Sequence, residues 1–76
     1  MTSIMPIPPK SLANLVQMAK RKENCVTIGG DIWEFAIGNT VAVIIGPLDD
    51  RATGHQRRDP HRAAEIRSEL AAGKGG

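Results

Sequence analysis

Three side chains of this sequence have the types needed for a nucleophile and its base, namely the single cysteine and the two histidines. Cys25 would supply the thiolate, and His55 or His61 would accept its proton. Cys25, however, begins an apolar stretch, where a free cysteine behaves as a small hydrophobic residue. Neither histidine has a family signature beside it. We therefore predict no catalytic residues and expect a protein that is not an enzyme.

The same histidines could ligate a metal together with a nearby aspartate. His55, Asp59 and His61 lack the spacing of one helical turn that brings two ligands onto a common face. Gly29, Gly30 and Gly38 match neither a dinucleotide-binding nor a P-loop pattern, so they indicate turns. We predict no metal and no cofactor.

One segment does support a binding function, because its side chains are mostly cationic. The arginines that we predict to bind a partner are Arg51, Arg57, Arg58, Arg62 and Arg67. Guanidinium groups bind phosphates and carboxylates through paired hydrogen bonds, so the segment 51–67 predicts an acidic protein partner or a nucleic acid. Trp33 and Phe35 are the only aromatic residues, and their positions favour a core, which disfavours base stacking.

Length limits what can support these side chains. A chain of 76 residues has room for one thin core and buries only about 60% of its unfolded surface. With one cysteine and no zinc spacing, a homodimer is the expected source of further burial. The lone cysteine and the absence of a basic, then apolar, N-terminal segment predict a cytoplasmic protein without membrane insertion.

Helix signals lie near both ends of the sequence. Closely spaced prolines predict an extended arm over residues 1–10. Ser11 is a good N-cap, and apolar residues at helical spacing predict a helix over residues 12–23. Asp59 followed by proline predicts the start of a second helix that runs to about Ala72. We expect residues 73–76 to form a disordered tail.

Between these helices, β-branched residues and glycine turns predict three short strands. They are residues 25–28, 32–37 and 41–45, followed by a polar loop over 48–58. The predicted domain, residues 11–72, is therefore α+β with the order α-β-β-β-α: a three-stranded antiparallel meander with both helices on one face. With a two-residue first turn, the side chains of 26 and 28 would share a face with those of 33 and 35.

In such a meander the third strand lies at an edge. It carries no charge, proline or bulge that would block pairing with another chain. Val41, Val43 and Ile45 are therefore the predicted dimer interface, unless a helix or the N-terminal arm covers this edge.

These features predict a small, non-enzymatic interaction protein that acts by stoichiometric binding to a partner protein. Small chains of this kind are typical of phages and mobile elements, where they often inhibit a host protein, and this base rate favours an inhibitor. The alternative is a dimeric regulator that binds DNA or RNA through residues 51–67.

Overall fold

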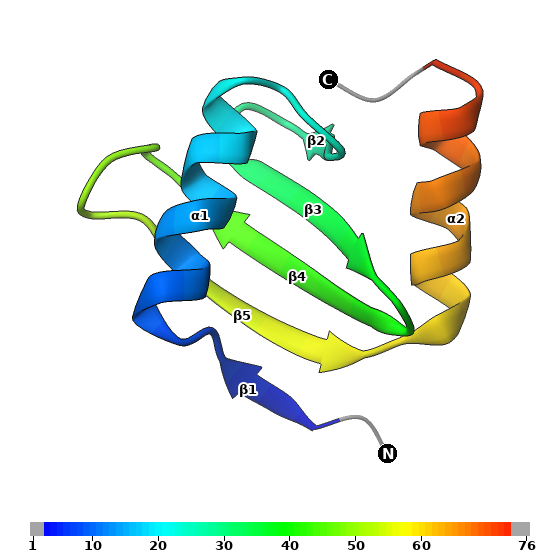
Figure 1. Ribbon diagram of the computed structural model, residues 1–76, viewed down its shortest axis with the longest axis horizontal. Coiled ribbons are helices and arrows are strands. Elements are labelled where there is room, and N and C mark those ends of the chain that lie inside the picture. Colours follow the sequence, from blue (N-terminus) through cyan, green and yellow to red (C-terminus); the bar gives the residue numbers. More distant parts are fainter. Residues whose placement is uncertain (1–2, 74–76) are drawn as a thin grey trace.

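A computed structural model describes residues 3–73 and shows an antiparallel sheet with a helix on each face (Figure 1). The elements are β1 (Ile4–Pro6), α1 (Pro9–Lys20), β2 (Val26–Ile28), β3 (Ile32–Ile37), β4 (Thr40–Ile45), β5 (Thr53–Arg58) and α2 (Pro60–Ala71). The five strands lie in the order β1-β5-β4-β3-β2. The α+β class agrees with the prediction, but the three-stranded meander is wrong. Apart from Gly73, the predicted tail lies outside the described residues.

β5 is the strand that the sequence pattern did not indicate. Thr53–Arg58 contains no apolar side chain, so neither alternation nor β-branching marked it as a strand. It forms because β4 pairs with it from Thr40, opposite Arg58, to Ile45, opposite Thr53. The predicted polar loop over 48–58 is therefore wrong for its second half.

β1 adds to the outer edge of β5 and ends at Pro6, opposite His55. Proline is tolerated there because an edge strand can spare an N–H donor. Next along the chain, Ile7 is buried and packs over Gly54, where a Cβ atom would lie 3.0 Å from Ile7 Cδ1 and 2.7 Å from the Val43 carbonyl oxygen. The missing side chain of Gly54 thus lets the N-terminal segment dock on the sheet.

The two helices confirm one predicted boundary and correct another. The side chain of Asp59 caps α2 by accepting a hydrogen bond of 3.0 Å from the Arg62 backbone N–H, as predicted. α1 begins earlier than predicted, because Pro9 occupies the first helical turn. It also ends earlier, since Lys22 and Asn24 have φ values of 57° and 55°. Within residues 3–73, no helix is long and apolar enough to cross a membrane.

The predicted register of the first hairpin is wrong by one residue. Ile28 pairs with Ile32, which leaves a three-residue loop, and Val26 lies opposite Glu34. Since side chains alternate between the faces of a sheet, this shift places Val26 and Ile28 on the face opposite Trp33.

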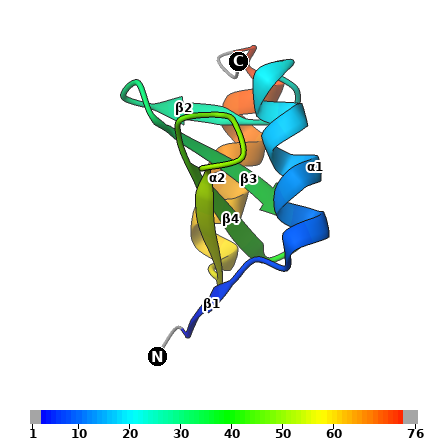
Figure 2. The same ribbon diagram turned by 90° about the vertical axis from the view of Figure 1, so that its left-hand side faces the viewer.

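The helices pack on opposite faces, as Figure 2 shows, and not on one face as predicted. On the α1 face, α1 covers Phe35, Ala42 and Ile44. On the α2 face, Ala63 and Ile66 cover an apolar layer made by Val26, Val41 and Val43. β4 contributes side chains to both layers, which explains its unbroken apolar run.

β4 is thus the central strand of the sheet and has no free edge, because β5 covers it. Val41 and Val43 are 0% and 6% exposed, while Ile45 is 38% exposed. The exposed edge on which we based the predicted interface of Val41, Val43 and Ile45 does not exist.

Candidate functional site

The five predicted partner-binding arginines do not form one surface, because most of them are engaged within the protein. Arg51 lies in the turn before β5, near the strand end remote from Arg57 and Arg58, and donates a 2.8 Å hydrogen bond from Nη2 to Asp49 Oδ2. The hydrogen bonds from Arg51 lower the pKa of the Asp49 carboxyl. Arg67 donates a 2.7 Å hydrogen bond from Nη1 to the Gly38 carbonyl oxygen.

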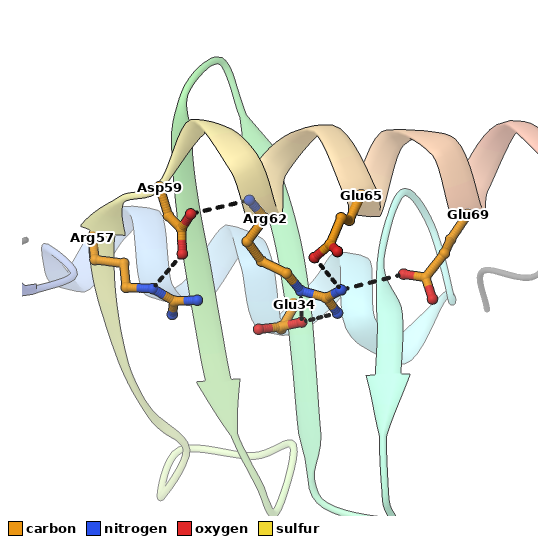
Figure 3. A network of polar contacts seen from close by, with 6 residues as sticks. All are labelled: Glu34, Arg57, Asp59, Arg62, Glu65 and Glu69. Atoms are coloured by element: carbon orange, nitrogen blue, oxygen red, sulfur yellow. Dashed lines mark hydrogen bonds and ion pairs between the residues drawn. The ribbon is translucent and has the colours of Figure 1, made fainter.

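Arg62 lies at the centre of a charged cluster between α2 and the sheet (Figure 3). Its Nε donates a 2.9 Å hydrogen bond to Oε1 of Glu34, which is only 6% exposed, and its Nη2 donates a second. Its Nη1 lies 3.3 Å from Glu65 Oε1 and 3.8 Å from Glu69 Oε2. The hydrogen bonds to Glu34 raise the pKa of the Arg62 guanidinium. Arg62 therefore fixes α2 to the sheet.

Arg57, in β5, also has a partner within the protein, which is the N-cap residue of α2. Its Nε lies 3.2 Å from Oδ2 of Asp59, whose other oxygen accepts the Arg62 backbone N–H (Figure 3). The backbone hydrogen bond from Arg62, followed by the side-chain bond from Arg57, lowers the pKa of Asp59. The carboxylate of Asp59 is therefore occupied by these two donors.

Arg58 is the exception. Within residues 3–73 it is the one arginine whose side chain has neither a hydrogen-bond nor an ion-pair partner. It is the last residue of β5 and lies opposite Thr40. Its side chain is on the same face of the sheet as Ala42, which is the α1 face. This position leaves its guanidinium in solvent.

Arg58 lines a groove of about 600 Å³, which we name the Arg58 groove. Its walls come from Ser3, Met5, Thr40, Gln56, Arg57, Arg58 and Pro60. No carboxylate lies among them. Two hydroxyl groups, an amide and the guanidinium of Arg58 instead offer donors to a ligand, with a methionine and a proline as apolar surface. The second guanidinium of the lining, that of Arg57, donates to Asp59.

The margin of the groove carries two exposed apolar side chains. Met5 is 58% exposed within it, and Ile37, opposite Thr40, is 53% exposed. Ile4 is 66% exposed but points to the α2 face, because it precedes Met5 in β1. These are the three most exposed large hydrophobic residues of the described chain. The sequence signal for them was weak: only the apolar residues within the proline-rich arm pointed to a contact there.

The remaining candidates for chemistry are not brought together. Cys25 is buried, and this burial raises the pKa of its thiol. Among residues 3–73, no three histidine, cysteine or acidic side chains are grouped so that they could hold a metal ion. No protein-family model, curated protein or solved structure matches this chain. The Arg58 groove is therefore the best candidate site, and its donors and apolar margin fit a binding function.

Proposed function

We propose that this protein acts by stoichiometric binding of a partner protein at the Arg58 groove, without catalysing a reaction. The proposal is supported chiefly by the position of Arg58, which has no internal partner and lies between the exposed side chains of Met5 and Ile37. Protein interfaces are enriched in arginine and methionine. Arginine is also among the residues whose truncation most often weakens binding strongly. In this proposal the protein works in the cytoplasm as an inhibitor of a host protein.

Nucleic-acid binding through residues 51–67 is less well supported than protein binding. Tight binding to a duplex needs several phosphate contacts, commonly from as many cations. Arg51, Arg57 and Arg62 already hold carboxylates, and Arg67 holds a carbonyl oxygen. Arg58 alone would supply too little charge, so we treat nucleic-acid binding as an outcome that the experiment must exclude.

We also propose a homodimer, but through the α2 face and not through an edge of β4. Ile28, Ile32 and Ile45 form a cross-strand row on this face, and Ile28 and Ile45 are 44% and 38% exposed. The row continues to Thr53 and contains no charge, so its chemistry fits the identical row of a second copy. Light scattering should show a dimer that Ile28→Lys dissociates. Thr27→Lys, on the other face of the same strand, should remain dimeric.

Affinity capture with matched variants tests the proposed function. The wild-type chain and Arg51→Glu should retain the same partner protein from a cytoplasmic extract at a defined stoichiometry. The double variant Met5→Ser, Ile37→Ser should lose it while remaining folded, because both side chains are already exposed. Equal capture by all three chains would contradict the proposal. So would binding to a duplex oligonucleotide that weakens steeply with salt and depends on Arg57 and Arg58.

A further inference from the structure

The chemistry of the Arg58 groove also indicates which group of the partner it receives. The residues that line it include no carboxylate and offer donors from two hydroxyl groups, an amide and the guanidinium of Arg58, which is unpaired within residues 3–73. A guanidinium presents a planar fork of donors, which matches the two oxygens of a carboxylate. An anionic group is therefore the natural ligand for this end of the groove.

We propose that the Arg58 groove binds an acidic side chain of the partner protein, with its carboxylate on Arg58 and apolar side chains on either side of it against Met5 and against Ile37. This inference rests on the proposed function and adds the chemical class of the ligand. A free phosphate would use the same donors. The apolar margin, however, has no counterpart in a phosphate group, whereas a peptide supplies charge and apolar surface together.

The acidic residues around Arg58 are engaged elsewhere, so a carboxylate ligand for Arg58 would come from another molecule. The nearest acidic residue in sequence, Asp59, accepts hydrogen bonds from Arg57 Nε and from the Arg62 backbone N–H. Glu65 lies on α2 beside Arg62, which it contacts at 3.3 Å. Asp59 and Glu65 are thus already paired with Arg57 and Arg62, and Arg58 is left able to bind a carboxylate of the partner.

A titration followed by NMR tests this inference with defined probes. The probes are a blocked tripeptide with glutamate between two leucines, the same peptide with glutamine, inorganic phosphate and a single-stranded DNA dodecamer. The glutamate peptide should shift the Arg58 Nε–H signal and the amide signals of Thr40 and Gln56 in a saturable way. The glutamine peptide should bind about tenfold more weakly, since a charge-assisted hydrogen bond is lost.

Variants provide the matched controls for the same titration. Arg58→Gln should reduce the affinity for the glutamate peptide about tenfold, and Arg51→Gln should leave it unchanged. Any of three results would overturn the inference: both peptides bind with equal affinity, phosphate or DNA binds more tightly than the glutamate peptide, or no signal from the groove shifts. If the peptide fails but partner capture still depends on Met5 and Ile37, the proposed function survives and only the carboxylate assignment falls. If the peptide binds but capture ignores the groove, the proposed function falls.

Discussion

Arg58 and Arg62 are four positions apart in sequence, but of the two only Arg62 has acidic partners within residues 3–73. Arg62 contacts three glutamates beneath and along α2, and one of them, Glu34, is buried in the sheet. Arg58 has no internal acceptor within residues 3–73 and faces a groove without carboxylates. Because β5 alternates its side chains, Arg58 points to the α1 face, away from the glutamates of the α2 face. The comparison separates a structural arginine from one available to a ligand.

The largest expected effect on stability comes from replacing Arg62. Arg62→Ala would leave the buried Glu34 carboxylate without its partner and should destabilise the fold by about 3 kcal/mol. Urea denaturation followed by circular dichroism measures this loss. The double variant Glu34→Leu, Arg62→Leu removes both members of the Glu34–Arg62 ion pair, so its loss of stability should be smaller than that of Arg62→Ala. If Arg62→Ala unfolded at the same urea concentration as the wild type, the structural role of Arg62 would be contradicted.

Two neighbouring positions at the start of β5 give the next largest contrast. Gly54→Ala introduces a Cβ atom 2.7 Å from the Val43 carbonyl oxygen, so the backbone must shift, at a cost of about 2 kcal/mol. Thermal unfolding monitored by circular dichroism should show a lower midpoint. Thr53→Ala, at an exposed neighbouring position, should change the midpoint little. An unchanged midpoint for Gly54→Ala would contradict the close approach of the β4 backbone to Gly54.

A smaller effect is expected from pH, through the cap of α2. The folded state lowers the pKa of Asp59, so its contribution to stability is present above the usual aspartate pKa of about 3.9. This contribution is lost as the pH falls through the lower, folded-state pKa. Urea midpoints measured from pH 6 to pH 2 should therefore fall below about pH 4. Asp59→Asn, which still caps the helix but cannot titrate, should show a weaker fall.

The smallest effect on stability is expected for Arg58 itself. Arg58→Ala removes an exposed side chain without an internal partner, so the free energy of unfolding should change by less than about 0.5 kcal/mol. Chemical denaturation of Arg58→Ala beside Arg62→Ala measures the contrast directly. A loss for Arg58→Ala as large as that for Arg62→Ala would remove the distinction between the two arginines.

The sequence was informative where side-chain pattern and backbone structure coincide. Apolar residues bounded by glycines located β3 and β4 to within one residue, and the Asp59 cap located the start of α2. β5 was missed because its side chains are polar, and only pairing with β4 makes it a strand. One extra residue in the loop before Ile32 reversed the expected faces of β2.

The candidate site was predictable only in part. The arginine-rich segment was visible in the sequence, but nothing in it distinguishes Arg58 from Arg57. That distinction arises because neighbouring residues of a strand point to opposite faces, and because Asp59 turns toward Arg57. Met5 and Ile37 are 32 positions apart in sequence, and the pairing of β1 with β5 and of β3 with β4 brings their strands into one sheet.

The availability of Arg58 to a partner is tested most directly by spectra of the arginine Nε–H signals, recorded with increasing amounts of the blocked glutamate peptide. The Arg58 signal should shift to saturation while those of Arg51 and Arg62 remain fixed. An unmoved Arg58 signal, or equal shifts for all three arginines, would contradict the claim that Arg58 is the arginine available to a partner.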